Sequence, residues 1–370
     1  MHYERSSHTI SLLANGKVLA ISGVSEGTYN TAELYDPSTG TWMTIGNKHI
    51  ETTFHAASVL FDGKVLVSGG IGRYENSINE SELYDPVTGL WTLTDGQMNN
   101  GRDQHTSTVL TDGKVLVVGG DRDDHETLQT AELYDPLIEH WKITGSMHVP
   151  RQEHTATVLN NGKVLVTGGL RSYTEAEAVR TAELYDPATE TWTITNNMTY
   201  ERYEHTASLL ADGKVLVVGG MQSDGGAVGK SELYDPLTGI WTLAGSMNYP
   251  RFLHTASVLK NGKVLVSGGG TDTSMSIDDT ELYDPSTRNW TVIDKMHVRR
   301  CSHAACILQN GNVIVSGGTT DYDPTNTVEL FNSSTGTFIN AVNNDNRKSP
   351  YNRPWALTNE KVSTIRKILW

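Results

Sequence analysis

Seven histidines recur along the chain at nearly equal distances, and imidazole can bind a metal ion or transfer a proton. They are separated by 47, 50, 49, 51, 49 and 49 residues. The seven are His8, His55, His105, His154, His205, His254 and His303. An Arg precedes six of them by three residues. Equivalent positions of a ring of repeats cannot bring three or four ligands to about 2 Å from one ion. We therefore assign no catalytic residue, metal ligand or cofactor, and expect Arg and His to join adjacent repeats.

Two other groups of reactive residues are weaker candidates. The segment 121–126 is rich in carboxylates that suit Ca²⁺, but it does not fit an EF-hand loop and is interpreted as a solvated loop. Cys301 and Cys306 lie five residues apart in one expected strand. Side chains at that spacing point to opposite faces, so no mutual disulfide is predicted.

Each histidine is the first residue of a longer sequence pattern that repeats along the chain. This pattern indicates which secondary-structure elements position the histidines. A short apolar run is followed by Asn-Gly or Asp-Gly, a hydrophobic run, Gly-Gly, and then Glu-Leu-Tyr-Asp-Pro and Trp. In the third copy, residues 105–110, 114–118, 130–134 and 140–144 have the length and composition of strands. Asn-Gly and Asp-Gly are two-residue hairpin turns, so consecutive strands, A to D, are expected to pair antiparallel.

A period near 50 residues is typical of propeller blades. One four-stranded sheet cannot bury both of its faces, so seven such sheets are expected to stack and close into a ring. The predicted fold is all-β: a seven-bladed β-propeller of about 49 residues per blade over residues 1–344. The repeated Trp is expected to pack between sheets. Residues 345–370 form a basic tail, expected either to lie disordered or to pack at the ring seam.

These repeats resemble the kelch repeat over residues 5 to about 342. The sequence motifs His-Thr-Ala-Ser-Val-Leu and Gly-Lys-Val-Leu-Val-x-Gly-Gly are similar to those of the galactose-oxidase-like branch of kelch propellers. That resemblance would imply a copper site with two Tyr, two His and a Tyr–Cys cofactor. These ligands and this cofactor cannot be assigned to residues of this chain, because both Cys lie in the last blade and most Tyr are repeated residues. Oxidase activity is therefore not expected.

The two faces of the expected disc differ in sequence. The A–B and C–D turns hardly vary, whereas the B–C loops and D–A connections, which leave from the opposite face, all differ, and specific function is expected there. The repeated charged positions nearly cancel, so almost all of the net charge of −14 lies at non-repeated positions. The candidate partner-binding residues are Arg73, Tyr74, Asp121, Arg122, Asp123, Asp124, His125, Glu153, Tyr173, Tyr203, Glu204 and Phe252. Of these, Tyr74, Tyr173, Tyr203 and Phe252 are expected to offer stacking surfaces.

An acidic surface repels phosphate backbones and favours cationic partners. We expect a monomeric, soluble, non-catalytic module that binds a protein or peptide of cationic character, and no nucleic acid. No apolar run approaches 18 residues, so no membrane insertion is predicted. The alternative is a carbohydrate- or metal-binding propeller related to galactose oxidase. No signal peptide pattern precedes Arg5, and the compartment stays open.

Overall fold

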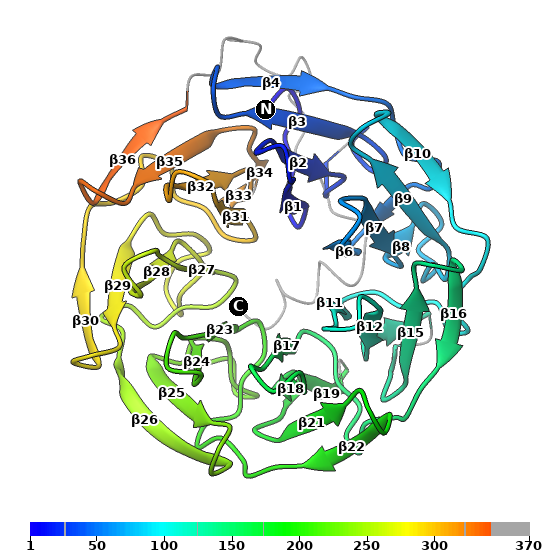
Figure 1. The fold of residues 1–370 in the computed structure, drawn as a ribbon. Coiled ribbons are helices and arrows are strands. Elements are labelled where there is room, and N and C mark those ends of the chain that lie inside the picture. The colour runs from blue at the N-terminus through cyan, green and yellow to red at the C-terminus, as the bar shows by residue number, and fades with distance from the viewer. Residues whose placement is uncertain (26, 124, 173, 322, 342–370) are drawn as a thin grey trace.

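Seven four-stranded antiparallel sheets form a ring in the computed structural model (Figure 1). The structure describes residues 1–25, 27–123, 125–172, 174–321 and 323–341. The expected tail, 345–370, lies outside the described residues. Every element in the described part of the chain is a strand, and it holds no helix long and apolar enough to cross a membrane. The prediction of an all-β, seven-bladed propeller is confirmed.

Each blade follows the order A-B-C-D from the axis outward. The A strands are β1 (Thr9–Leu12), β6 (Ala56–Val59), β11 (Thr106–Val109), β17 (Thr155–Val158), β23 (Thr206–Leu209), β27 (Thr255–Val258) and β31 (Ala304–Ile307). The B strands are β2 (Val18–Ile21), β7 (Val65–Ser68), β12 (Val115–Val118), β18 (Val164–Thr167), β24 (Val215–Val218), β28 (Val264–Ser267) and β32 (Val313–Ser316).

The C and D strands complete the blades toward the rim. The C strands are β3 (Ala32–Asp36), β9 (Ser81–Asp85), β15 (Ala131–Asp135), β21 (Ala182–Asp186), β25 (Lys230–Asp235), β29 (Thr280–Asp284) and β35 (Val328–Asn332). The D strands are β4 (Thr41–Thr44), β10 (Leu90–Leu93), β16 (His140–Ile143), β22 (Thr191–Ile194), β26 (Ile240–Ser246), β30 (Asn289–Val292) and β36 (Thr337–Asn340).

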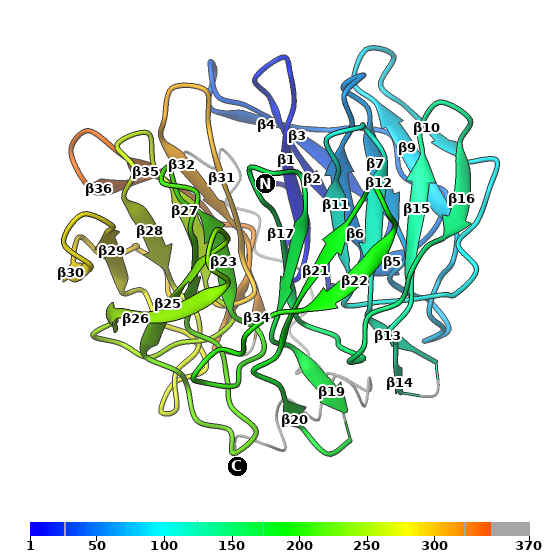
Figure 2. The ribbon, with the colours of Figure 1, turned by 60° about the horizontal axis from the view of Figure 1, so that its bottom comes forward.

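The B–C loops and D–A connections leave the disc on one side, which we call the loop face. Figure 2 shows β13–β14 and β19–β20 projecting from that side. Four short strand pairs lie there, namely β5–β8 (Thr52–Thr53, Ile71–Gly72), β13–β14 (Asp121–Arg122, Glu126–Thr127), β19–β20 (Leu170–Ser172, Glu177–Ala178) and β33–β34 (Thr319–Thr320, Asp323–Pro324). The A–B and C–D turns occupy the opposite side, which we call the turn face.

The Gly-Gly pair that follows the B strand in six blades is required by close approaches of the main chain; blade one has Ser22-Gly23 there. Gly119 has a φ of 62°, and a Cβ there would lie 2.3 Å from the carbonyl oxygen of Arg151 in the next blade. Gly120 has a φ of 98°, and its Cβ would lie 2.4 Å from the carbonyl oxygen of Asp103. At Gly119 and Gly120 a side chain would therefore be both strained and in collision with the main chain; in blade one, Ser22 adopts a φ of 52° at the first position.

The ring closes without a blade shared between the two ends of the chain. Strands β1–β4 form one complete sheet and β31, β32, β35 and β36 form another. The inner strand β31 contacts β1 as every other A strand contacts the next. At this seam, the Gly318 amide donates to the Arg5 carbonyl oxygen at 2.9 Å, and His8 Nε2 lies 2.9 Å from Ser316 Oγ. Closure of the ring within repeats one and seven is as expected.

Hydrophobic clusters fill the space between neighbouring sheets. Trp141 of blade three is 4 % exposed and packs with Leu66 and Leu83 of blade two. Its ring centroid lies 5.1 Å from that of Tyr134, its cross-strand neighbour. Trp192 donates through Nε1 to the Gly145 carbonyl oxygen of the preceding blade at 2.7 Å. The repeated Trp therefore packs between sheets, as predicted.

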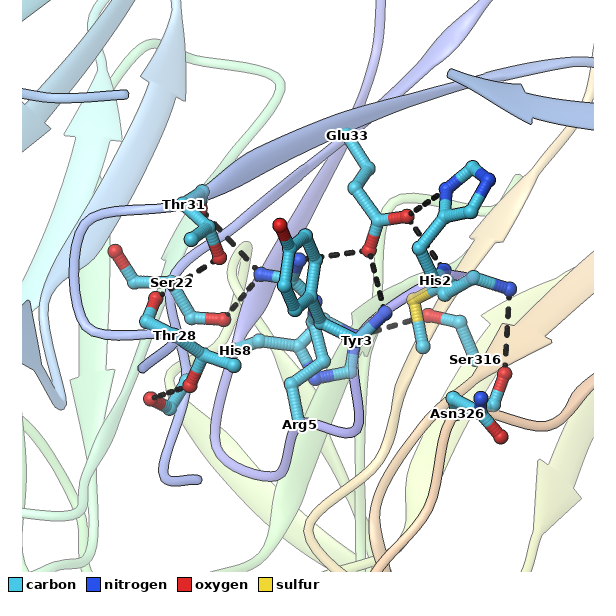
Figure 3. A network of polar contacts seen from close by, with 12 residues as sticks. His2, Tyr3, Arg5, His8, Ser22, Thr28, Thr31, Glu33, Ser316 and Asn326 are labelled. Carbon is cyan, nitrogen blue, oxygen red and sulfur yellow. Dashed lines mark hydrogen bonds and ion pairs between the residues drawn. The ribbon is translucent and has the colours of Figure 1, made fainter. Parts of the chain in front are cut away.

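The repeated Arg is fully buried and bonds within its own blade. Figure 3 shows the Arg5 side chain between the Ser22 carbonyl and the Glu33 carboxylate. Arg5 Nη1 donates to Ser22 O at 2.6 Å, and Nη2 lies 2.7 Å from Glu33 Oε2. Five other blades repeat this pair at 2.9 Å, as Arg102–Glu132, Arg151–Glu183, Arg202–Glu232, Arg251–Glu281 and Arg300–Glu329. The expectation that this side chain joins adjacent blades was wrong, because the matching carboxylate stands on its own C strand.

The main chain of the same Arg does connect two blades. The carbonyl oxygen of Arg102 accepts the Gly70 amide of the preceding blade at 2.8 Å. The glutamates also accept amide hydrogens, as Glu183 does from His148 and Val149. Burial alone would raise the pKa of Glu183, but these bonds and the Arg151 charge outweigh it and hold the pKa below its usual value.

The seven repeated histidines link neighbouring blades, as predicted. His154 Nε2 lies 3.0 Å from Thr106 Oγ1 of the preceding blade, and His254 Nε2 lies 2.9 Å from Thr206 Oγ1. Burial, together with the nearby Arg charges, lowers the pKa of His254 to about 3. Burial lowers the pKa of the other six as well. These imidazoles are neutral structural groups.

Blade two has the buried glutamate, Glu82, but lacks the repeated Arg. Lys48 stands where the other six blades have Met, and Thr52 stands where the other six have Arg. The Lys48 side chain is buried, and Nζ donates to Thr52 Oγ1 at 3.0 Å. Burial lowers the pKa of Lys48 to about 8, against the opposing charges of Glu82 and Glu51. A positive charge from another position thus acts on the buried Glu82, whose carboxylate accepts the His49 and Ile50 amides.

Replacing Trp141 with Ala should lower the free energy of unfolding by roughly 3 to 5 kcal/mol, because it leaves a large cavity between blades two and three. Chemical denaturation measures this loss. The matched control, Leu137→Ser, changes a side chain that is 91 % exposed on the turn face and should alter stability little. A W141A protein as stable as the wild type would contradict the packing role.

Acid should destabilise the propeller below about pH 6.5, the ordinary histidine value. Below that pH the histidines bind protons in the unfolded chain but stay neutral when buried in the folded protein. The free energy of unfolding therefore falls as pH falls. Calorimetry at pH 5 in buffers of different ionisation enthalpy measures proton uptake on unfolding. His254→Gln should reduce that uptake by about one proton. Leu137→Ser, which removes no titratable group, should not. Equal uptake in all three proteins would contradict this explanation.

Lys48→Met should destabilise the protein by roughly 1 to 3 kcal/mol, because it leaves the Ile50 carbonyl oxygen and the Thr52 hydroxyl without the Nζ donor and removes the Lys48 charge that acts on Glu82. The double variant Lys48→Met with Thr52→Arg restores the residues of the other blades and should recover most of the loss. Urea denaturation of wild type, single and double variants measures both effects. If the double variant were less stable than Lys48→Met alone, a positive charge at position 52 would not replace the one at position 48.

Candidate functional site

A collar of seven residues surrounds the axis on the loop face. Each lies directly before a repeated His, and all seven have left-handed φ values between 50° and 53°. They are Ser7, Phe54, Gln104, Glu153, Glu204, Leu253 and Ser302. Six main-chain hydrogen bonds connect them, each from an amide to the carbonyl oxygen of the collar residue one blade before, at 2.9 to 3.2 Å. Because the main chain holds the collar, its side chains are free to differ.

A second layer lies one residue earlier in each D–A connection. These residues pair with the residue that follows Gly-Gly in the same blade: Ser6 with Val24, Thr53 with Ile71, Asp103 with Asp121, Gln152 with Leu170, Tyr203 with Met221, Phe252 with Gly270 and Cys301 with Thr319. All seven D–A members of this layer are buried. Their chemistry divides the ring into a polar part and an apolar part.

The polar part lies at blades two to four. Asp103, Asp121 and Gln152 are each 0 % exposed. Asp103 Oδ2 accepts from Ser77 Oγ at 2.9 Å, and His125 Nδ1 lies 3.5 Å from Asp121 Oδ2. The expectation that Asp121 belongs to an exposed acidic loop was wrong, because the residue forms two main-chain bonds with Asp103 that hold it inside.

The apolar part lies at blades four to six. Leu170, Ala178, Tyr203, Met221 and Phe252 form one buried cluster beneath the loops. Tyr203 is 5 % exposed and Phe252 is 1 % exposed. Neither ring therefore offers a stacking surface, contrary to the expectation. Both occupy the second layer, whose side chains point into the loop face rather than out of it.

Glu153 and Glu204 bring two carboxylates together at the collar. They belong to adjacent blades, and the Glu204 amide donates to the Glu153 carbonyl oxygen at 3.2 Å. Burial, and then the charges of Glu204, Asp103 and Asp121, raise the pKa of Glu153 well above its usual value. Burial raises the pKa of Glu204 to about 8. A cationic group placed here would restore both charges and release protons.

Several buried acceptors surround this pair. Among the described residues, Gln104 Oε1, Gln152 Oε1 and Glu204 Oε2 have no hydrogen-bond donor. The Gln152 amide lies beside Thr127, the strand partner of Asp121. A buried acceptor without a donor is costly. The arrangement therefore favours a ligand that brings donors and positive charge.

The other predicted site residues lie farther out on the loop face. Tyr74 is 87 % exposed, and the neighbouring Arg73 is also exposed. Arg122 pairs with Glu126 across β13–β14, and Asp123 accepts the Ser77 amide. In the described part of the chain, no hydrogen bond or ion pair joins them to Glu153 or Glu204. The predicted residues Asp124 and Tyr173 lie outside the described residues.

The sequence placed the pairs of residues just before each repeated His on the face where specific function was expected. Gln104, Asp103 and Gln152 belong to these pairs but were not among the selected candidate residues, although they stand beside Glu153 and Glu204. The left-handed backbone and the main-chain ring that join the collar could not be read from the sequence. In the described part of the chain, no group of three or more His, Cys, Asp or Glu residues is arranged to hold a metal ion, and both cysteines are free.

Comparison with solved structures shows where else this arrangement of strands occurs. A fungal alcohol oxidase of the AA5 family, solved in complex with copper, superposes with a TM-score of 0.69 at 18 % identity, covering 86 % of this chain and 70 % of that one. The structure of YjhT superposes with a TM-score of 0.62 at 16 % identity, covering 79 % and 98 %. At such identity, these likenesses concern the fold alone.

Family models place the sequence more closely. The Attractin/LZTR1 β-propeller model matches residues 18–233, and the KLHDC2/KLHL20/DRC7 kelch-repeats domain model matches residues 153–357. No curated protein sequence matches the chain. Each family model spans more than half of the sequence, and the two together cover all but the first residues and the end of the tail. The chain belongs to the kelch-repeat β-propeller family.

Proposed function

We propose that this propeller is a non-catalytic binding module that recognises a protein or peptide through its loop face, and that the collar carboxylates Glu153 and Glu204 receive a cationic side chain of the partner. The single observation that supports this most is the pair of adjacent, half-buried carboxylates beside acceptors that have no donor among the described residues. A Lys or Arg side chain supplies both the charge and the N–H donors.

The surrounding surface supports a larger contact around that anchor. Arg73, Tyr74 and Asp123 are exposed on neighbouring loops, and exposed aromatic residues beside a partly buried charge are typical of binding hot spots. The rigid collar would hold the carboxylates in place before the partner arrives, which reduces the ordering cost of binding. Kelch propeller domains commonly serve as such interaction modules.

A second candidate function is carbohydrate or metal binding of the galactose-oxidase kind. The observation that favours it is the likeness in fold to a copper-containing alcohol oxidase. Elemental mass spectrometry of the purified protein, together with assays of hydrogen peroxide release from sugars and alcohols, separates the two functions. Stoichiometric copper with peroxide release would overturn the proposed binding role as the main activity.

Selection of random peptides against the full chain tests the proposed function. We expect enrichment of Lys- and Arg-containing peptides, and at least a tenfold loss of affinity in the double variant Glu153→Gln with Glu204→Gln. Glu139→Gln with Glu190→Gln is the matched control: both residues also have left-handed φ values, 49° and 56°, but lie at C–D turns on the turn face. Equal losses in the two double variants would contradict a specific site.

The affinity for such a peptide should rise with pH between about pH 6 and pH 9. The raised pKa values mean that Glu153 and Glu204 hold protons which a cationic side chain must displace. For each proton released on binding, the affinity rises by up to about tenfold when the pH rises by one unit. Titration calorimetry should find this slope in the wild type and a flatter one in the Glu153→Gln, Glu204→Gln variant. A peptide that binds independently of pH would place the contact elsewhere.

A further inference from the structure

The chain carries a cationic segment of its own. Residues 345–370 hold six basic residues, Arg347, Lys348, Arg353, Lys361, Arg366 and Lys367. Only Asp345 and Glu360 oppose them, in a protein whose net charge is −14. The segment that departs most in charge from the rest of the protein thus has the sign that the loop face would attract.

The described chain ends on the loop face. Ala341 follows β36, and its amide donates at 3.0 Å to the carbonyl oxygen of Val328, the first residue of β35. That residue stands directly after the B–C loop of blade seven, so the last described residue, Ala341, lies at the loop-face end of the outermost strand. The outer and inner strands of a blade lie about 14 Å apart, three spacings of about 4.8 Å. Roughly five extended residues span that distance, so the chain that follows Ala341 is several times longer than the radius of a blade.

A second pair of acidic residues lies at the seam between blades seven and one. Glu4 is half-buried at the ring seam and Asp323 is exposed in β34. Burial, and then the charge of Asp323, raise the pKa of Glu4. The loop face thus carries two acidic pairs, one at the seam where the described chain ends and one at the collar.

We propose that segment 345–370 is an intramolecular occupant of the loop face, with its Lys and Arg side chains over the carboxylates of Glu4, Glu153 and Glu204, where it competes with other cationic partners. The proposal rests on the proposed function of the collar. Tethering makes the segment a ligand at high effective concentration. An external partner must therefore displace it, which sets a threshold on the affinity of productive partners.

The test uses the full chain and a fluorescent synthetic peptide with the sequence of residues 345–370. A tail-neutral protein carries Gln at positions 347, 348, 353, 361, 366 and 367. Fluorescence anisotropy at pH 8 and low salt compares its affinity for the peptide with that of the wild type. The Glu153→Gln, Glu204→Gln change and the Glu139→Gln, Glu190→Gln control are then added to the tail-neutral protein.

We expect the tail-neutral protein to bind the peptide at least tenfold more tightly than the wild type does. The collar change should remove that binding, the turn-face control should keep it, and added salt should weaken it. Equal affinity of the wild type and the tail-neutral protein would overturn the proposal, yet leave the collar as a cation site if binding still needed Glu153 and Glu204. Absence of binding, or binding insensitive to the collar change, would also overturn it, while the peptide selection judges the proposed function separately.

Discussion

Six of the seven blades bury a guanidinium and a carboxylate together, and the position of the loop face depends on this pair. Arg151 and Glu183 illustrate the geometry: the Arg opens blade four, and the Glu stands on its C strand. Two charges removed from water need each other and several hydrogen bonds. The Arg side chain also bonds to the Gly168 carbonyl oxygen, so it fixes the D–A connection to strands B and C at once. The His that follows three residues later then meets the preceding blade.

The same constraint explains why the collar can vary in sequence. Its residues are placed by left-handed backbone, by main-chain hydrogen bonds and by the buried Arg close before them. Their side chains contribute little to closing the ring, so Phe54, Gln104 and Glu153 occupy equivalent positions in neighbouring blades. A protein that separates placement from chemistry in this way can change what it binds without changing its fold.

The order of strands could be read from the sequence because each turn carries its own signal. Asp112-Gly113 predicts the hairpin between β11 and β12, and the four strands of that blade begin and end within one residue of the expected bounds. Burial on the loop face could not be predicted in this way. Tyr203 and Asp121 stand in irregular segments where no alternating pattern assigns a face, and both are turned inward by pairing between the D–A connection and the B–C loop. The direction of the Arg side chain was missed for a related reason, since a repeat shows which residues recur but not whether they meet within or between units.

The seam between blades seven and one has a mechanical consequence. Many closed rings are locked by a strand that crosses between the two ends of the chain, but here each end completes its own sheet. The N-terminal amine and the Arg5 amide donate to carbonyl oxygens of Asn326 and Thr325 across that seam, both at 3.3 Å. A force that separates blades seven and one is therefore resisted only by the non-covalent contacts of one blade interface, and these contacts share the force. The ring would open there into a curved row of intact blades before any single sheet is unravelled.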